Sequence, residues 1–417
     1  MKSEPFVAGL DFGTTKICTI VGQWDEENSS EKFPRIKILG VGRAPSTGVK
    51  KGVVVNIEET VECIRQAVQE AEVSAGVKIN RASVGIAGGH IKGFNSSGVV
   101  GIKGREVSDY DISRVIDAAR AVAIPSDRMA LHVLAQEYRV DEQGGIRDPL
   151  GMAGTRLEAK AHIVTAASSA IQNIARCCQK AGVHVSEFIL QPLASAKAVL
   201  SEDERDLGVA LVDVGGGTTD LAIFHGGSIV HTAVIPLGGC HITQDLAVGL
   251  RTPQSEAEKI KVKKGKALKA MLGTDHSLEV PGVGGRPARV VEQKILGDII
   301  EPRVEEMFKL VNYEIVQRGL TDILGGGVVI TGGCTQLPGM LELAEYIFDL
   351  PVKRAHPEVL VMGAEKVASP GYSTGVGLVL WALENSRSGK RRQQQWYTVE
   401  GFRKITRQVK TWFEELF

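Results

Sequence analysis

The sequence predicts an α/β protein in which two duplicated halves enclose one ligand cleft. Three observations support this fold class: a glycine- and threonine-rich hairpin pattern at residues 7–22, a second copy at residues 209–227, and a glycine-rich turn within residues 325–348. The chain has 417 residues, which at about 150 residues per domain allows two or three domains with hydrophobic cores.

The two hairpin patterns match each other step by step. The first reads VAGLDFGTTKICTIVG and the second reads VALVDVGGGTTDLAIFHGG. Each is an apolar run, an aspartate, a Gly/Thr turn and a second alternating apolar run, which is typical of a β-hairpin with a glycine-rich tip. Asp11 and Asp213 occupy the same place in both. A matched pair in one chain indicates two related halves.

Each hairpin tip carries groups that bind a polyphosphate. Glycine frees backbone N–H groups, threonine supplies hydroxyls, and Lys16 supplies a cation. The candidate ligands are Gly13, Thr14, Thr15, Lys16, Gly215, Gly216, Gly217, Thr218 and Thr219. Asp11 and Asp213 are candidates to hold Mg²⁺ through water, because Mg²⁺ dehydrates reluctantly and takes few carboxylates. A single Gly-Thr hairpin is more often an ordinary turn, whereas two matching copies favour a nucleotide site.

The third pattern, GGGVVITGGCTQLPGMLELAEYIF, predicts a buried strand, a turn and a helix. Gly332 and Gly333 would let a ligand approach the backbone at this turn. The sequence has no complete P-loop, dinucleotide-binding or H-E-x-x-H motif, so these three site types are not predicted.

The charge balance, the cysteine spacing and the apolar runs indicate which partners and which location to expect. Lys plus Arg number 49 and Asp plus Glu also number 49, so we expect no nucleic-acid partner. The six cysteines include no C-x-x-C, which argues against a disulfide framework or a metal cluster. The N-terminal residues do not form a signal-peptide pattern, and no run of eighteen apolar residues occurs. We therefore expect a cytoplasmic protein without a transmembrane span.

Three motifs resemble those of the actin, heat-shock chaperone and sugar kinase superfamily. DFGTTK (11–16), DVGGGTTD (213–220) and TGGCTQLPG (331–339) are similar to its phosphate-one, phosphate-two and adenosine motifs, in the same order. The resemblance implies an actin-like fold with ATP and Mg²⁺ as cofactors. It also implies that Glu258 and Lys261, in the segment A-E-x-I-K, approach the ribose or adenine. Taken from its residues alone, that segment is a charged helix with a solvated face.

Within this superfamily the chain resembles the FtsA family of bacterial cell-division proteins. The similarity extends through VGIAGGHIKGFNSSG (84–98), VPGVGGRPARVVEQKILGDIIEPR (280–303), YSTGVGLVLWAL (372–383) and the tail. It implies an ATP-binding protein that self-assembles into filaments on the cytoplasmic face of the membrane at the division site. Such a protein anchors FtsZ filaments, which form the Z ring, and helps to recruit later division proteins.

The resemblance also divides the chain. The expected parts are a first actin-like core (1–84 and 167–200), an inserted subdomain (85–166), a second core (201–245 and 305–383), a lobe (246–304), a flexible linker (384–398) and an amphipathic helix (399–417). The inserted subdomain is implied to serve self-association and contacts with later division proteins.

Residues 246–304 contain an unusual run of lysines and then a predicted helix over VVEQKILGDIIEPRVEEMFKLVNYEIV. Its expected apolar stripe is Val291, Ile295, Ile299, Val304 and Phe308. The resemblance implies that this lobe receives the C-terminal peptide of FtsZ, with Lys294 and Arg303 meeting acidic groups of the peptide. The alternative is that both are ordinary solvent-facing charges.

The tail has the pattern of a helix that lies in a membrane surface. Residues 384–395 are polar and basic, which predicts a linker. After it, one helical face carries Phe402, Ile405, Val409, Trp412, Phe413 and Leu416, and the other carries Arg403, Lys404, Arg407 and Lys410. We expect this helix to bind an anionic membrane reversibly. The alternative is a helix docked on the protein body.

Hydrolysis is less clearly indicated. Related chaperones and filament proteins open the segment E-P-x-A-A-A with a glutamate that positions water, whereas Gln191 stands at that place here. Glutamine orients a water but is a poor base, so we expect at most a slow ATPase. Alternative functions on the same fold are a small-molecule (sugar-type) kinase, a chaperone-like ATPase and a pilus-assembly adaptor. No pattern marks the aspartate base that a kinase requires.

Overall fold

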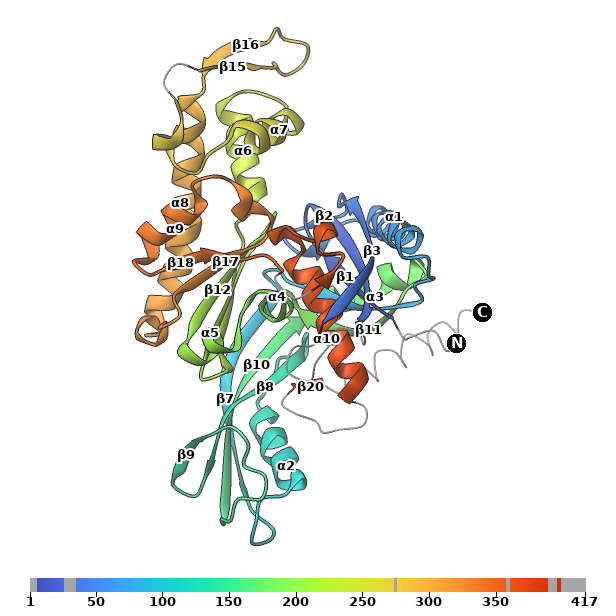
Figure 1. Cartoon of the computed structure of the whole chain (residues 1–417), viewed down its shortest axis with the longest axis vertical. Helices are drawn as coiled ribbons and strands as arrows, with labels where there is room; N and C mark the ends of the chain where they lie inside the picture. Colours follow the sequence, from blue (N-terminus) through green and yellow to red (C-terminus); the bar gives the residue numbers. More distant parts are fainter. Residues whose placement is uncertain (1–5, 26–34, 274–275, 358–360, 389–395, 399–417) are drawn as a thin grey trace.

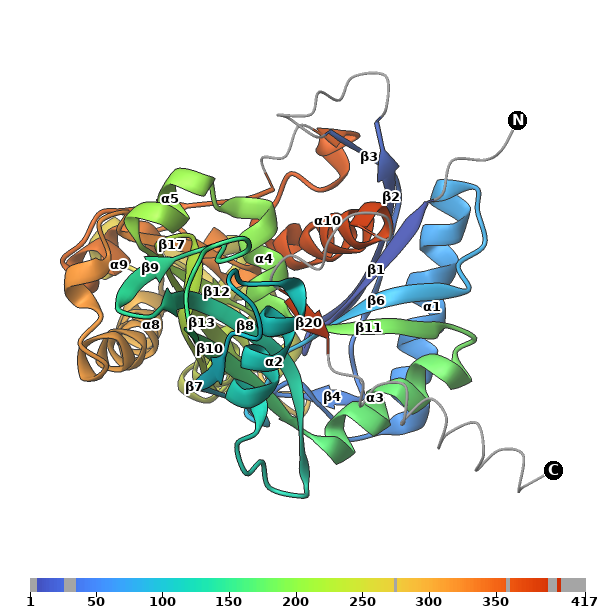
Figure 2. The same ribbon diagram turned by 90° about the horizontal axis from the view of Figure 1, so that it is seen from below.

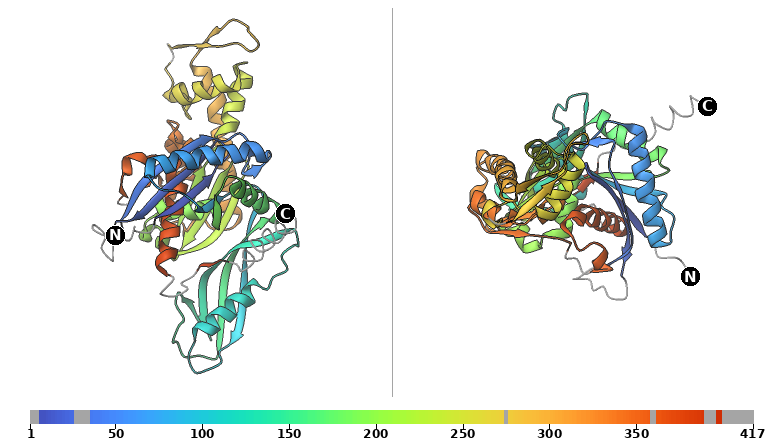
Figure 3. Two further views of the ribbon diagram at one scale, coloured as in Figure 1. Left: turned by 90° about the vertical axis from the view of Figure 1, so that its right-hand side faces the viewer. Right: turned by 90° about the horizontal axis from the view of Figure 1, so that it is seen from above.

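Two α/β halves lie side by side, and two smaller lobes extend from them in opposite directions (Figure 1). The structure is a computed structural model that describes residues 6–25, 35–273, 276–357, 361–388 and 396–398. The lobe of residues 246–304, here called the basic lobe, lies at one end. The inserted subdomain of residues 85–166, here called the insert, lies at the other, as a second view also shows (Figure 3).

The first half is a sheet with helices on both faces. Its elements are β1 (Val7–Phe12), β2 (Lys16–Trp24), β3 (Ile36–Pro45), β4 (Val49–Lys50), β5 (Val53–Val54), α1 (Ile57–Ala75), β6 (Arg81–Ile86), α3 (Ser168–Lys180), β11 (His184–Leu190), α4 (Gln191–Val199), β19 (Val361–Met362) and α10 (Ser373–Ser388). The sheet order is β11-β6-β1-β2-β3-β19. The expected second core (305–383) is therefore corrected at its end, because β19 pairs with β3 and α10 packs against β1, β2 and β6 of the first half. Helices α1 and α3 cover its outer face, while α10 lies on its inner face (Figure 2).

The second half repeats this core. Its elements are α5 (Glu202–Leu207), β12 (Val209–Val214), β13 (Thr219–His225), β14 (Ser228–Ile235), β17 (Val328–Thr331), α9 (Met340–Phe348) and β18 (Val352–Arg354), in the sheet order β14-β13-β12-β17-β18. In both halves the first hairpin strand pairs antiparallel with the second and parallel with a later strand: β1 with β2 and β6, and β12 with β13 and β17. The predicted hairpins and the α/β class of two duplicated halves are confirmed.

Helix α10 packs very closely against α4 in the space between the two sheets. Val376, Leu378 and Val379 of α10 are buried. Gly377 faces the backbone of α4, where a Cβ at Gly377 would lie only 1.8 Å from the Ala194 carbonyl oxygen. Only glycine permits this approach, so the sequence of α10 sets the distance between the helices.

The insert forms a sheet and helix with a core of their own. It contains β7 (Ile91–Gly101), α2 (Asp109–Arg120), β8 (Arg128–Val140), β9 (Gln143–Ile146) and β10 (Arg156–Ala167). Helix α2 begins after Ser108, with a reciprocal capping box between Ser108 and Asp111. The insert also contacts β14 of the second half, where His162 Nε2 lies 2.8 Å from Thr232 Oγ1 and Gln136 Nε2 donates to the Ile229 carbonyl at 2.8 Å.

The basic lobe contains α7 (Gln254–Lys264), β15 (Ser277–Val280) and β16 (Arg289–Glu292), together with the end of α6 (Gly239–Gly249) and the start of α8 (Lys294–Gln317). The predicted start of its long helix was wrong, because Arg289–Glu292 pair as a strand with Ser277–Val280. Val291 therefore belongs to β16. The buried face of α8 is Leu296, Ile300, Val304, Met307, Phe308, Val311 and Ile315, while Ile295 and Ile299 are only partly buried.

The expected linker, residues 384–398, is also corrected. Helix α10 continues to Ser388, where Glu384 pairs with Lys197 and Asn385 donates to Glu187 at 3.1 Å. Residues Trp396–Thr398 form a further strand, β20, at the edge of the insert, giving the sheet order β20-β8-β10-β7. The polar, basic composition of residues 384–395 predicts a linker and gives no sign of these contacts. The predicted amphipathic helix, 399–417, lies outside the described residues, and within the described part no helix is long and apolar enough to cross a membrane.

Candidate functional site

A cleft of about 720 Å³ opens between the two halves, a volume in the usual range for a small-molecule site. Its lining includes Asp11, Gly13, Thr14, Thr15, Lys16, Gln191, Asp213, Gly215, Gly216, Gly217, Thr218, Glu258, Lys261, Gly332 and Gly333. Gln191 was predicted to position water, and the others are the residues predicted for nucleotide binding, of which one, Thr219, is absent from the lining. Thr219 is fully buried and donates its hydroxyl to the Leu237 carbonyl at 2.9 Å, so it fastens the hairpin instead.

The two hairpin tips have the same local geometry. The Gly13 N–H donates to the Lys16 carbonyl at 3.1 Å, and the Gly215 N–H donates to the Thr218 carbonyl at 2.9 Å. The tips face each other closely: a Cβ at Gly217 would lie 2.5 Å from Thr14 Oγ1. Glycine is therefore required in the second tip by the side chains of the first.

Asp11 lies at the base of the first tip and is buried. Gln191, the first residue of α4, donates its side-chain amide to Asp11 Oδ1 at 3.1 Å and to the Phe12 carbonyl at 3.2 Å. Burial raises the pKa of Asp11 to about 6, with the Lys16 charge opposing and the Asp213 charge adding to this increase. The predicted water-positioning residue thus holds an acidic residue of the site in this structure.

Asp213 occupies the matching place in the second tip. The Ser195 hydroxyl donates to its Oδ2 at 2.7 Å, and the Thr374 hydroxyl lies at 3.4 Å. Burial raises the pKa of Asp213, and both hydrogen bonds oppose the increase. Gly332, at φ 91°, leaves room for this carboxylate, because a Cβ there would lie 2.4 Å from Asp213 Oδ1.

Asp220 is a cleft residue that the sequence analysis missed. It is the direct cross-strand partner of Asp213 and lines the same cleft. Thr218 donates to its Oδ2 at 2.9 Å, while its buried Oδ1 has no hydrogen-bond partner. Burial and the nearby Asp213 charge raise the pKa of Asp220 to about 8. The signal was present in DVGGGTTD, since pairing across the tip places the last aspartate opposite the first.

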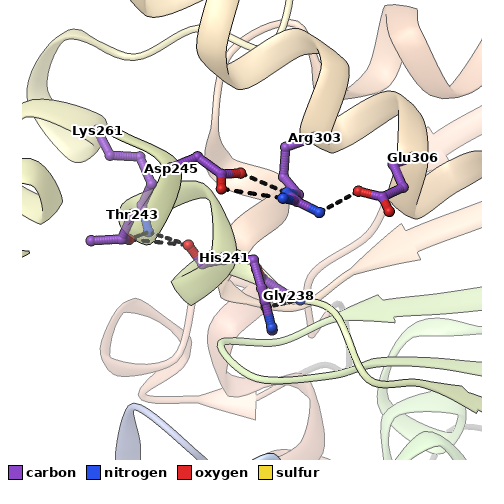
Figure 4. A network of polar contacts seen from close by, with 8 residues as sticks. Gly238, His241, Thr243, Asp245, Lys261, Arg303 and Glu306 are labelled. Carbon is purple, nitrogen blue, oxygen red and sulfur yellow. Dashed lines mark hydrogen bonds and ion pairs between the residues drawn. The ribbon is translucent and has the colours of Figure 1, made fainter. Parts of the chain in front are cut away.

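The adenosine side of the predicted site is formed by α6 and α7. Lys261 Nζ lies 2.6 Å from Glu258 Oε2 and donates to the Gly239 carbonyl at 3.0 Å. It also donates to Thr243 Oγ1 at 2.9 Å (Figure 4). Cys240 and Cys334 also line this part of the cleft. Burial raises the pKa of Cys334 to about 11, so its thiol is neutral at pH 7. Both residues predicted for this side from the resemblance therefore face the cleft.

The acidic groups suit a hydrated divalent cation. Asp11 and Asp213 supply one carboxylate from each half, and the unpartnered oxygen of Asp220 lies in the same buried region. In the described residues no group of three or more Asp, Glu, His or Cys side chains forms a metal site. Two carboxylates that line one cleft suit Mg²⁺, which keeps several of its waters and takes few carboxylates.

The two cations predicted to bind a peptide are not brought together. Lys294 is exposed at the start of α8. Arg303 is bonded to Asp245 of α6, at 2.6 and 3.2 Å, and to Glu306 (Figure 4). Nine residues separate the two cations, and at about 100° per residue they lie on opposite sides of the helix. The predicted membrane residues, 402–416, lie outside the described part of the chain.

Comparisons with known proteins agree with this architecture. A family described as cell division protein FtsA matches residues 210–377, and an SHS2 domain inserted in FtsA matches residues 88–165. Among solved structures, a PilM–PilN type IV pilus biogenesis complex has a TM-score of 0.65 at 14% identity, over 90% of this chain and 98% of that one. MreB5 of Spiroplasma citri bound to ADP has a TM-score of 0.56 at 13% identity, over 94% and 100%. These structural likenesses show an actin-like fold.

Relatives named cell division protein FtsA are similar over nearly the whole chain. The protein from Pseudomonas aeruginosa is 48% identical over 389 residues, which are 93% of this chain and 92% of the relative. That from Escherichia coli K12 is 37% identical over 417 aligned residues, covering 98% and 96%. Similarity of this extent does not favour the sugar-type kinase. The chain belongs to the FtsA family of cell-division proteins.

Proposed function

We propose that this protein binds ATP with Mg²⁺, self-assembles on the cytoplasmic face of the membrane at the division site, and anchors FtsZ filaments there. One observation carries the nucleotide part: two matched glycine-rich tips face each other across a cleft of about 720 Å³, each with an aspartate at its base. Membership of the FtsA family supports the proposed self-assembly, membrane attachment and anchoring of FtsZ filaments.

Different residues of the cleft would bind different parts of Mg-ATP. The backbone N–H groups of the tips and the hydroxyls of Thr14, Thr15 and Thr218 would contact phosphate oxygens, and Lys16 would supply the positive charge. Asp11 and Asp213 would hold the hydration shell of Mg²⁺. Glu258, Lys261, Gly332 and Gly333 would contact the nucleoside. Bound Mg-ATP would supply a terminal phosphoryl group. The hairpin tips would then have two states, one with and one without this group bound.

We expect the protein to hydrolyse ATP slowly at most. Gln191 donates to Asp11 at 3.1 Å, and an amide has no proton-accepting group suited to activating water. Nucleotide would then serve mainly to set the arrangement of the two halves.

The proposed contacts with protein partners and with the membrane are inferred from membership of the FtsA family. The insert would serve self-association and later division proteins. The basic lobe would receive the FtsZ C-terminal peptide through Lys294, whereas Arg303 would contribute mainly by fastening α8 to α6. Residues 399–417 would bind anionic lipid, and because one such helix binds reversibly, assembly of several copies would strengthen attachment. We expect no nucleic-acid partner.

Co-sedimentation with anionic liposomes tests the proposal. The full chain is compared with a chain ending at Thr398, which keeps every described residue, and with the single variant Trp412→Glu. Each is assayed with and without Mg-ATP. We expect only the full chain to pellet, more strongly with Mg-ATP, and the Asp213→Ala variant to lose the nucleotide effect. Equal pelleting of all three chains would contradict the membrane part. Failure of the intact chain to bind Mg-ATP would contradict the nucleotide part.

A further inference from the structure

The residues just before α10 form a short turn that contacts both halves at the cleft. Residues 369–372, here called the cleft turn, include a 3₁₀ helix, η5 (Pro370–Tyr372). The Ser369 hydroxyl accepts the Gly371 N–H at 3.3 Å. Directly after the turn, Ser373 Oγ lies 2.7 Å from Thr331 Oγ1 of β17, and both residues are buried. The turn is therefore fastened to the second half.

The cleft turn reaches the phosphate tip of the first half through Lys16. The Lys16 ammonium donates to the Gly371 carbonyl at 2.5 Å and lies 4.3 Å from the centre of the Tyr372 ring. A side chain at residue 371 would crowd this contact, because a Cβ there would lie 3.3 Å from Lys16 Nζ. Two groups from one turn thus fix the end of a side chain with four rotatable carbon–carbon bonds.

Both of these partners are uncharged. A carbonyl oxygen and an aromatic face attract a cation without neutralising it, whereas a carboxylate partner would cancel the charge that an anion needs. Lysine is flexible and loses rotamer freedom when it binds a phosphate. A lysine already held in place by neutral groups has lost part of that freedom before the ligand arrives.

We infer that Tyr372, with the Gly371 carbonyl, is a positioning residue that holds the Lys16 ammonium at the first tip ready for a polyphosphate anion. This inference rests on the proposed nucleotide function. Tyr372 also meets Arg43, whose Nη1 lies 3.4 Å from the Tyr372 hydroxyl, so the ring stands between two cations that line the cleft. The ring face serves Lys16, and the hydroxyl serves Arg43.

Two variants separate these contributions. Tyr372→Phe keeps the ring face and removes the hydroxyl, while Tyr372→Leu removes the ring face. In calorimetric titrations with Mg-ATP, we expect Tyr372→Leu to weaken binding about three- to tenfold, the range of a partly desolvated cation–π contact, and Tyr372→Phe to stay within about twofold. Thermal unfolding of each variant checks that the fold is retained. If Tyr372→Leu fails to fold, Gly371→Ala replaces it, because a Cβ 3.3 Å from Lys16 Nζ would push the ammonium away from the Gly371 carbonyl by a few tenths of an ångström.

A second measurement needs no nucleotide. The rate of reductive methylation of Lys16 is followed by peptide mass spectrometry in the full chain, with exposed Lys37 as the internal reference. We expect faster methylation of Lys16 in Tyr372→Leu and an unchanged rate in Tyr372→Phe. An unchanged Lys16 rate in Tyr372→Leu, or an equal loss of ATP affinity in both variants, would overturn the inference. A wild-type chain that does not bind Mg-ATP would instead refute the proposed function, and the methylation rates would still test the positioning role.

Discussion

Asp213 and Asp220 lie directly opposite each other across the second hairpin, and both carboxyl groups are buried at the cleft. Their positions differ in hydrogen bonding: Asp213 accepts from Ser195, while one oxygen of Asp220 has no partner. The first hairpin has no such pair, because Cys18 stands opposite Asp11. The two tips are alike in backbone and unlike in their titratable groups, because the second tip holds a pair of buried acidic side chains where the first holds one.

The first prediction concerns Asp220 and pH. Its pKa rises from an ordinary 3.8 to about 8, so the folded protein holds a proton that the unfolded chain releases above about pH 4. Stability should therefore fall as pH rises from about 4 to 8, by up to about 1.4 kcal/mol per pH unit from this group. Asp220→Asn should make the slope shallower and be the more stable protein at pH 8. Urea unfolding without nucleotide, from pH 5 to 8, measures this. Asp322→Asn, at an exposed site, is the control, and an unchanged slope in Asp220→Asn would refute the prediction.

The second prediction concerns the hydroxyl that bonds Asp213. Ser195→Ala should lower the free energy of unfolding by about 1–3 kcal/mol at pH 8, because a buried carboxylate loses its shorter hydrogen bond. Ser96→Ala is the matched control, since Ser96 donates to the neutral Ala119 carbonyl at 2.8 Å. The control should lose about 0.5–1.5 kcal/mol. If both variants lose the same amount in urea unfolding, the charge of Asp213 is not the cause.

The third prediction concerns Gln191. Gln191→Glu replaces the donor to Asp11 with a second carboxylate, so it should destabilise the nucleotide-free protein at pH 8 by about 1–3 kcal/mol. The loss should shrink below pH 6, where Asp11 becomes protonated. Gln66→Glu provides a matched control, because Gln66 donates to Glu62 at 3.3 Å on an exposed surface. A loss of stability in Gln191→Glu that does not depend on pH would contradict this explanation.

The fourth prediction concerns the contact between α10 and α4. Alanine normally stabilises a helix relative to glycine, but Gly377→Ala should destabilise the protein by at least about 2 kcal/mol, because its methyl group overlaps the Ala194 carbonyl. Gly89→Ala, where no atom lies within 4 Å of the added carbon, should have a small effect. Thermal unfolding compares the two variants. Similar melting temperatures would mean that the helices move apart at little cost.

The fifth prediction separates the two cations of the basic lobe. Lys294→Ala should weaken binding of an FtsZ C-terminal peptide and leave stability unchanged, because Lys294 is exposed. Arg303→Ala should lower stability by about 0.5–1 kcal/mol, since it removes a partly exposed ion pair with Asp245. Fluorescence anisotropy of a labelled peptide and urea unfolding supply the two readouts. Peptide affinity that is unaffected by Lys294→Ala would remove that residue from the site.

Local patterns predicted the parts of the site that depend on neighbours in sequence. The two hairpins and the strand before Gly332 follow from alternation and glycine placement. Facing tips could also be predicted, because duplication places equivalent turns at equivalent positions.

Other features depend on contacts between distant segments. Tyr372 meets Lys16 across 356 positions of sequence, and no local pattern marks that contact. The sequence around Val291 predicts a helix, but Val291 pairs with Leu278 and so belongs to a strand. Thr219 belongs to a threonine-rich tip, but its alternation within β13 turns the hydroxyl away from the cleft toward Leu237. In each case the residue's position or contact depends on a partner that is distant in sequence, which a pattern of neighbouring residues does not show.

Strand β20 determines where a mechanical load would enter the molecule. Residues 399–417 follow β20 directly, and β20 pairs with β8 through Trp396 and Leu134, Tyr397 and Val133, and Thr398 and His132. A force on residues 399–417 would first load the backbone hydrogen bonds between β20 and β8 at the edge of the insert sheet. His132 accepts the Leu190 N–H at 3.0 Å, so the tension would pass on into β11 of the first half. This route does not run through α10. It enters the first half at Leu190, directly before Gln191, so a load on the tail would reach the residue that holds Asp11 at the cleft.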